Sequence, residues 1–248
     1  MFSTETFTVG AWVSLADPVV AEMVAPDAEF VMLDTEHAPN STATIANQIR
    51  AIEAADGDAV PLARALDNDT GAIKRLLDVG ARGVMVPMVE SATETREAVE
   101  AARYPPEGSR GVAGMRASAY GRDLGEYVAT ANDEITLVVQ IETQTGLDNV
   151  DEIAAVDGVD ALFVGPADLS ANLGVFGQFE SDVFRGAVET ILAAGGETAT
   201  PVGTLATSPE GVDRYCAWGF DYLIAGTDAG HIQRGVSNLG ERAREQVE

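Results

Sequence analysis

Residues 34–39, Asp-Thr-Glu-His-Ala-Pro, combine two acids with one of the chain's two histidines. They follow the apolar run 30–33, which is typical of a buried parallel strand. Histidine titrates near neutral pH and can pass a proton in either direction, so His37 is a candidate general acid or base. A lone histidine is often structural, but a position where a buried strand meets solvent favours a catalytic role.

Two further acids follow apolar runs. Glu142 comes directly after residues 136–141, and Asp168 comes shortly after residues 161–164. Because neighbouring parallel strands end at the same edge of a sheet, we expect these carboxylates to lie close together. Two close carboxylates repel each other unless a cation lies between them, and an all-oxygen site favours Mg²⁺, Mn²⁺ or a similar ion. The alternative is that each acid caps a helix or pairs with an arginine.

Arg64 ends the apolar run 59–63, so we expect its guanidinium at the same edge. The planar fork of an arginine suits a carboxylate or an enolate oxygen. Arg64 can equally form an ion pair with Asp34, Glu36 or Glu142, and the two roles are compatible.

Lys74 is the only lysine of the chain, and it lies within a segment of helical periodicity. An aldolase or decarboxylase that works through a Schiff base needs a desolvated lysine in its site, which Lys74 cannot supply from an exposed helical face. The sequence also lacks the glycine-rich phosphate-binding loop and the G-x-S-x-G nucleophile motif. Metal-assisted chemistry is the reaction class that remains.

The composition excludes several kinds of partner. A formal charge of −25 repels nucleic acid and anionic membranes, so neither is expected as a partner. The single cysteine, Cys216, cannot form an internal disulfide, and no signal peptide or long apolar segment is present, which predicts a cytoplasmic protein. The acid-rich, lysine-poor composition predicts a halophilic source.

Short apolar runs alternate with longer segments of helical periodicity, the pattern of a parallel sheet covered by helices. Eight runs are expected to be strands: residues 9–13, 30–33, 59–63, 83–86, 136–141, 161–164, 201–204 and 222–225. No linker divides the chain, so we expect residues 1–248 to form a single (β/α)8 TIM-barrel domain. Active sites of such barrels form at the carboxyl ends of the strands, where the candidate residues lie.

Helices are expected over residues 41–55, 69–79, 91–102, 183–194 and 208–218. Residues 228–248 should form a terminal amphipathic helix, interrupted or kinked around Gly235. Residues 104–119 are the one long irregular insert, and because long loops in compact domains tend to be functional, we expect this insert to cover the site.

Seven motifs, in the right order and spacing, resemble those of a known family. They are residues 10–12, 34–40, 76–80, 86–89, 103–111, 140–143 and 165–170. Together they resemble the HpcH/HpaI class II pyruvate aldolases, such as the 4-hydroxy-2-oxoheptanedioate and 2-dehydro-3-deoxyglucarate aldolases. The resemblance implies reversible, metal-dependent cleavage of a 4-hydroxy-2-oxo acid, a 2-keto-3-deoxy sugar acid or a hydroxy-oxo-diacid, into pyruvate and an aldehyde. The alternatives are a lyase like citrate lyase β or the malyl-coenzyme A enzymes, and a non-catalytic keto-acid-binding barrel.

The resemblance also implies catalytic roles. Glu142 and Asp168 would hold a divalent metal (Mg²⁺, Mn²⁺ or Co²⁺), and Arg64 would neutralise the enolate oxygen. His37, oriented by Asp78, would act as the base, directly or through a metal-bound water, on the hydroxyl of the bond that breaks. From the sequence pattern, Asp78 can instead be a capping or ion-pairing residue near the end of a helix.

The remaining implied contacts are with substrate and with neighbouring subunits. The backbone amides near Gly165, Ala167 and Asp168 would receive the pyruvate carboxylate. Further substrate contacts are expected from Trp12, Asp34, Gln140 and Leu205. Such aldolases assemble as trimers or hexamers and exchange the last helix between neighbours, so we expect a homo-oligomer.

Overall fold

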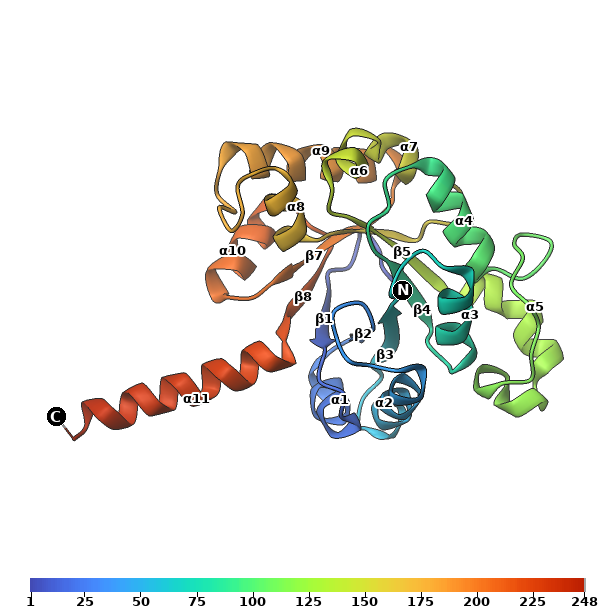
Figure 1. Cartoon of the computed structure of the whole chain (residues 1–248), viewed down its shortest axis with the longest axis horizontal. Coiled ribbons are helices and arrows are strands. Elements are labelled where there is room, and N and C mark those ends of the chain that lie inside the picture. Colours follow the sequence, from blue (N-terminus) through green and yellow to red (C-terminus); the bar gives the residue numbers. More distant parts are fainter. Residues whose placement is uncertain (248) are drawn as a thin grey trace.

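Eight parallel strands close into one barrel in the order in which they occur in the chain (Figure 1). The computed structural model describes residues 1–247. The strands are β1 (Thr8–Val13), β2 (Phe30–Asp34), β3 (Val60–Arg64), β4 (Gly83–Val86), β5 (Thr136–Ile141), β6 (Ala161–Val164), β7 (Val202–Ala206) and β8 (Tyr222–Thr227). Four of them are buried along their whole length, which explains why their sequences are apolar without alternation. The predicted (β/α)8 TIM barrel is confirmed.

Side chains fill the inside of the barrel at the amino ends of the strands. Phe2 stacks on Tyr222 with ring centroids 4.0 Å apart and meets Phe30 edge-on at 5.1 Å. Glycines opposite these rings make the necessary room, because a Cβ on Gly10 would collide with the ring of Phe30 and one on Gly203 with the ring of Tyr222. The closed floor leaves the carboxyl ends of the strands as the open side of the barrel.

Helices follow the strands, and all of them except the last surround the barrel. They are α1 (Pro18–Val24), α2 (Thr42–Ala54), α3 (Thr70–Asp78), α4 (Ala92–Ala102), α5 (Leu124–Glu134), α6 (Gln144–Asp148), α7 (Val150–Ala154), α8 (Pro166–Asn172), α9 (Asp182–Thr198), α10 (Pro209–Trp218) and α11 (Asp228–Glu245), with short 3₁₀ turns η1 (Ala25–Asp27) and η2 (Arg116–Gly121). The side chains of Ser41, Ser91 and Ser208 accept hydrogen bonds from first-turn amides, which is why their helix starts were predictable. No helix of residues 1–247 is long and apolar enough to cross a membrane.

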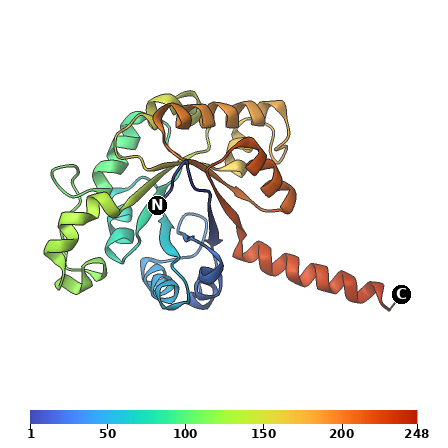
Figure 2. The ribbon, with the colours of Figure 1, turned by 180° about the vertical axis from the view of Figure 1, so that it is seen from behind.

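The last helix, α11, leaves the barrel as a projecting arm, seen from both sides in Figures 1 and 2. It is continuous through Gly235, so the predicted interruption or kink there is wrong. Its root is fixed by the buried Asp228, whose carboxylate accepts hydrogen bonds from the Ser14 amide at 3.1 Å and the Leu15 amide at 2.8 Å. Further along, Val236 and Leu239 are 70% and 75% exposed.

The insert at residues 104–119 lies between α4 and α5, on the side where helices return to the amino ends of the strands. Arg116 donates a hydrogen bond of 3.2 Å to the carbonyl of Val79, just after α3 and before β4 begins. This places the insert at the end of the barrel opposite the carboxyl ends of the strands. The expectation that it covers the site of its own chain is therefore wrong.

Candidate active site

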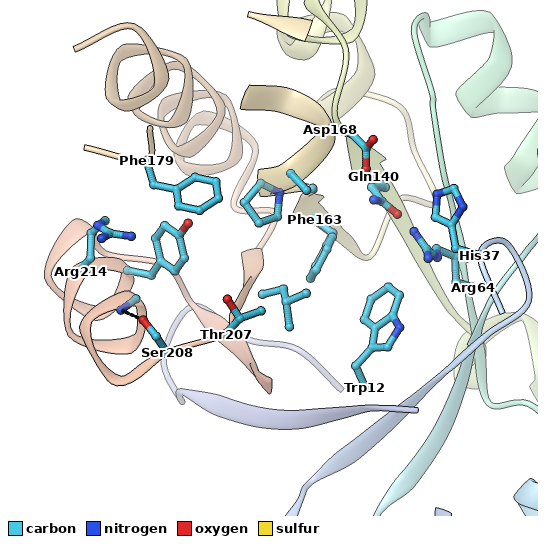
Figure 3. Close-up of a pocket in the computed structure, with 16 residues that line it drawn as sticks. Trp12, His37, Arg64, Gln140, Phe163, Asp168, Phe179, Thr207, Ser208 and Arg214 are labelled. Carbon is cyan, nitrogen blue, oxygen red and sulfur yellow. Dashed lines mark hydrogen bonds between the residues drawn. The ribbon is translucent and has the colours of Figure 1, made fainter. Parts of the chain in front are cut away.

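A cavity of about 340 Å³ opens at the carboxyl ends of the strands (Figure 3). Most of the predicted site residues line it: Trp12, His37, Arg64, Gln140, Gly165, Ala167, Asp168 and Leu205. They come from six different strands or from the turns that follow them, so the barrel brings together residues far apart in the sequence. Asp34 and Glu142 lie buried outside this lining, and Asp78 lies elsewhere.

Arg64 is held in a dense ionic network at this rim. Its Nε and Nη2 donate hydrogen bonds of 2.8 Å each to the two carboxylate oxygens of Asp34. Its Nη1 lies 2.6 Å from Glu36 Oε2, and its guanidinium lies over the Trp12 ring, 4.6 Å from the centroid. The ion pairs considered for Arg64 are therefore present, and Arg64 also lines the cavity, so its contact with substrate stays a prediction.

His37 lies at the mouth of the cavity, with its side chain 67% exposed. Its Nε2 is 3.7 Å from Glu36 Oε1, so Glu36 lies between the imidazole and Arg64. Burial raises the pKa of Glu36, although Arg64 and His37 both oppose this. Glu36 was not among the predicted site residues. The available signal was its place in the acidic segment directly after β2, next to His37.

Glu142 is buried beneath the cavity. Its Oε1 accepts a hydrogen bond of 2.9 Å from the Met88 amide, and its Oε2 accepts one from the Gln140 side chain. Met88 adopts a left-handed conformation at φ 54°, which is strained for a residue with a side chain. The pKa of Glu142 is raised to about 7, chiefly by burial and further by the charge of Asp168, against the opposing effect of the Met88 hydrogen bond.

Asp168 lies in the first turn of α8, which begins at Pro166 directly after β6. Gly165 must lack a side chain, because a Cβ there would collide with Oε2 of Glu142. The Gly165 amide donates to the carbonyl of Ile141 at 3.3 Å, so it is already used. The amides left for a substrate carboxylate are the first-turn amides of Ala167 and Asp168, which have no partner four residues earlier in the helix.

Asp78 is the last residue of α3 and lies near the opposite end of the barrel. It accepts a hydrogen bond of 2.9 Å from Arg110, whose side chain is fully buried against the Tyr104 ring at 4.6 Å. The structure therefore does not bring Asp78 to His37 within one chain, and it shows the ion-pairing alternative instead. The carboxylate next to His37 is that of Glu36.

The two acids fit a divalent cation. A buried carboxyl whose pKa rises to about 7 next to a second carboxyl lacks a positive charge, and a cation between the two would supply it. No group of three or more His, Cys, Asp or Glu side chains able to hold a metal occurs among residues 1–247. Two protein carboxylates, with other positions left to water or substrate, are the donor set that Mg²⁺ commonly uses.

A closed (β/α)8 barrel with acids, an arginine and a histidine at the carboxyl ends of its strands defines a TIM-barrel enzyme. The model of the HpcH/HpaI aldolase/citrate lyase family matches residues 8–234. The chain belongs to this family, as its motifs predicted, and it is therefore a carbon–carbon lyase of the aldolase type.

Individual proteins that are similar to the chain support its assignment to this family. The chain is 41% identical over 238 residues to the hydroxypyruvate/pyruvate aldolase of Delftia acidovorans, covering 93% of this chain and 86% of that one. It is 37% identical to the 5-keto-4-deoxy-D-glucarate aldolase of Salmonella arizonae, covering 94% and 91%. The crystal structure of a family protein from Burkholderia cenocepacia J2315 superposes with a TM-score of 0.93 at 36% identity, covering 97% and 95%.

Proposed function

We propose that this protein is a metal-dependent aldolase that cleaves a 4-hydroxy-2-oxo acid into pyruvate and an aldehyde, and catalyses the reverse addition. The observation that carries the proposal is the convergence of His37, Arg64 and Asp168 on one cavity above the buried Glu142. These groups can bind a 2-oxo acid and accept a proton from its hydroxyl. The activities named for the relatives, on pyruvate and a keto-deoxy sugar acid, are of this reaction type.

The 2-oxo acid end of the substrate would bind between Arg64 and α8. Arg64 is oriented by Asp34 and lines the cavity, so it can stabilise the oxygen that gains charge as the C3–C4 bond breaks. The amides of Ala167 and Asp168 would bind the carboxylate, and Gln140, Trp12 and Leu205 would enclose the substrate. A substrate enclosed in this way would displace water from the cavity, which would strengthen its interactions with the developing charge.

Glu142 and Asp168 would hold the divalent metal, Mg²⁺, Mn²⁺ or Co²⁺. When bound, such an ion polarises the keto group and stabilises the negative charge that develops on its oxygen. It does so without a Schiff base, which agrees with the position of Lys74 in α3, away from the residues that line the cavity.

His37 would take the proton from the 4-hydroxyl group. The C3–C4 bond then breaks, its electron pair passes to the pyruvate part as an enolate, and the former hydroxyl carbon leaves as an aldehyde. Protonation of the enolate at C3 gives pyruvate, so protons and electrons balance. Glu36 faces Nε2 of His37 and would orient the imidazole, which leaves Nδ1 to accept the proton.

We also propose a homo-oligomer, a trimer or hexamer, in which α11 docks on a neighbouring copy. An apolar groove of about 440 Å³ lies beside β1 and α1 and includes Val20, Met23 and Val24. Val236 and Leu239 carry exposed apolar surface along α11, which turns away from its own barrel (Figure 2). The apolar face of α11 from one copy, laid in this groove of the next, would remove both apolar surfaces from water.

The test is release of pyruvate from a panel of 2-keto-3-deoxy sugar acids and hydroxy-oxo-diacids, followed by coupling to lactate dehydrogenase. Assays with Mg²⁺, Mn²⁺ and Co²⁺ should include molar KCl, because the charge of −25 and the predicted halophilic source favour screening. We expect turnover that EDTA abolishes. Absence of turnover with every metal and substrate would overturn the proposal.

Two variants separate the roles. Glu142→Ala should lose metal affinity, whereas His37→Ala should keep metal and pyruvate binding and lose cleavage. Tight binding of pyruvate without turnover in the wild type would instead support a non-catalytic keto-acid-binding barrel. Turnover that requires a coenzyme A thioester would support the citrate lyase-like alternative.

A further inference from the structure

We propose that Arg214 recognises an anionic group at the far end of the aldehyde, so that the preferred substrate is a 2-oxo acid with a second negatively charged end. This inference rests on the proposed function, because it concerns the part of the cavity beyond the pyruvate subsite. Arg214 lies in α10 and lines the same cavity as His37, Arg64 and Asp168.

The cavity has polar groups at two sides and apolar groups between them. Figure 3 shows His37 and Arg64 on one side, Arg214 and Ser208 on the other, and Phe163 between. A ligand that spans this cavity therefore needs a polar head at each end. Its volume of about 340 Å³ is typical of sites for small molecules and leaves room beyond a three-carbon acid.

Arg64 and Arg214 are the two cationic side chains of Lys or Arg type among the described residues that line this cavity. The charge of Arg64 is already matched by Asp34 and Glu36, at 2.8 Å and 2.6 Å. Arg214 forms an ion pair with Glu180 at 3.2 Å, and the exposed carboxylate of Glu210 and the hydroxyl of Tyr215 also lie near its guanidinium. The side chain of Glu180 is 82% exposed, and an ion pair with so exposed a partner contributes little.

The guanidinium of Arg214 is nevertheless held in place. Its side chain is only 17% exposed, and its carbon Cζ lies 6.0 Å from the ring centroid of Phe179 and 5.6 Å from that of Tyr215. Its Nε is buried and has no hydrogen-bond partner among residues 1–247. A partly desolvated, restrained and incompletely paired arginine loses little further freedom on binding an anion.

Ser208 lies at the same side of the cavity. Its oxygen accepts a hydrogen bond of 3.2 Å from the Gly211 amide, and its hydroxyl is engaged with the exposed carboxylate of Glu210. The anion-binding group on this side is therefore the guanidinium of Arg214, whose planar fork suits a carboxylate or a phosphate. The net charge of −25 repels anionic substrates from the protein as a whole. The positive charge of Arg214 offsets this repulsion inside the substrate-binding cavity.

The direct test is calorimetric binding of two 2-oxo acids that lack the 4-hydroxyl and cannot be cleaved, in the presence of Mg²⁺. They are 2-oxoadipate, with a second carboxylate, and 2-oxohexanoate, with a neutral tail. We expect the wild type to bind 2-oxoadipate at least tenfold more tightly, as about 1.4 kcal/mol or more of charge-assisted hydrogen bonding would give. Arg214→Gln should lose this preference, and Arg214→Lys should keep part of it.

Two further variants serve as controls. Arg185→Gln removes an exposed arginine of α9 that pairs with Glu189, so it should leave the preference unchanged. Glu180→Gln frees Arg214 of its competitor, so it should keep or raise the preference. An equal preference in Arg214→Gln and wild type, with both folded by circular dichroism, would overturn the assignment, as would a wild type with no preference.

Aldol addition to pyruvate identifies the kind of anion. One pair of acceptors is 4-oxobutanoate and butanal, and the other is glyceraldehyde 3-phosphate and glyceraldehyde. If Arg214→Gln selectively loses activity on 4-oxobutanoate, the recognised anion is a carboxylate. If it selectively loses activity on glyceraldehyde 3-phosphate, the recognised anion is a phosphate. Loss confined to the neutral acceptors would argue against the assignment.

Failure of the proposed function would be recognised separately. Exchange of the pyruvate methyl protons with D₂O, followed by NMR, requires the pyruvate site but no aldehyde. A wild type that shows neither exchange nor addition is not an aldolase, while the calorimetric comparison still decides the role of Arg214 because it needs no turnover.

Discussion

Asp34 and Arg64 face each other across β2 and β3, with two hydrogen bonds of 2.8 Å between the carboxylate and the guanidinium. Their Cα atoms are partners in the strand register, so formation of the barrel itself brings the two charges together. Both side chains are nearly inaccessible to solvent, at 3% and 7%. The pair fixes the direction in which Arg64 can meet a substrate.

Asp34→Asn should therefore lower both stability and activity. Removing one partner of a buried ion pair costs about 3 kcal/mol, here lessened by Glu36, and a misplaced Arg64 should lower kcat/KM at least tenfold. Urea unfolding and steady-state kinetics measure the two effects. The matched control is Glu134→Gln, which removes the partner of the exposed Arg82 and should cost less than about 1 kcal/mol. Equal effects of the two changes would contradict the prediction.

Glu36→Gln should slow turnover by about tenfold or more, because the carboxylate facing Nε2 of His37 is lost. Metal affinity should change little, since Glu36 is not one of the two proposed metal carboxylates. Steady-state kinetics and calorimetric titration with Mg²⁺ separate the two quantities. Asp67→Asn, an exposed acid in the turn after β3, is the control and should keep full activity. A loss of metal affinity equal to the loss of turnover would refute a role through His37.

The pKa of Glu142 predicts a pH-dependent stability for the metal-free protein. The carboxyl titrates near pH 7 when folded and near 4.5 when unfolded. Between these values the folded state binds more protons, so the free energy of unfolding falls as pH rises, by about 3 kcal/mol in total. We expect this loss in urea unfolding with EDTA between pH 4.5 and 8. Glu142→Gln should flatten it, and an unchanged pH slope in that variant would disprove the assignment.

The same carboxyl predicts the pH dependence of metal binding. A proton competes with the cation for Glu142, so Mg²⁺ affinity should fall as pH decreases below about 7. Added Mg²⁺ should restore most stability at pH 8 and little at pH 5. Isothermal titration at the two pH values measures this, and affinities that are equal at both would count against Glu142 as a ligand.

Val236→Glu and Leu239→Glu should each weaken the homo-oligomer, because they place a charge on the exposed apolar face of α11. Sedimentation velocity in molar KCl should show smaller species, with little change in the fold by circular dichroism. Ser237→Glu, on the same helix but about 100° further round, should leave the assembly intact. Dissociation by the serine variant alone would place the contact on the other face.

Lys74→Arg should leave cleavage within about twofold, because Lys74 lies in α3 outside the cavity lining. Sodium borohydride added with pyruvate should neither inactivate the enzyme nor add mass to it. A mass increase that disappears in Lys74→Arg would show a Schiff base and overturn the metal-dependent mechanism.

The sequence alone determined the barrel and most of the rim. Buried parallel strands are apolar throughout and end where the chain turns polar. The ends of β2, β3, β5 and β6 could therefore be located in the sequence, and a candidate residue lies at or just after each of them. His37, Arg64, Glu142 and Asp168 were predicted as candidates in this way, because strand ends are a local property of the chain. The family motifs then supplied the reaction type.

Tertiary structure alone decided which of these residues meet. Asp78 and the insert at residues 104–119 were expected near His37, but each lies at or after the carboxyl end of a helix, which in this barrel returns to the amino ends of the strands. Glu36, Met88 and Arg214 had no sequence signal strong enough to mark them, because their roles depend on the neighbours that β3, β5 and α10 bring to them. The direction of α11, straight and away from the barrel, could likewise not be predicted from periodicity. Periodicity shows that one face of a helix is apolar, but not which surface covers that face.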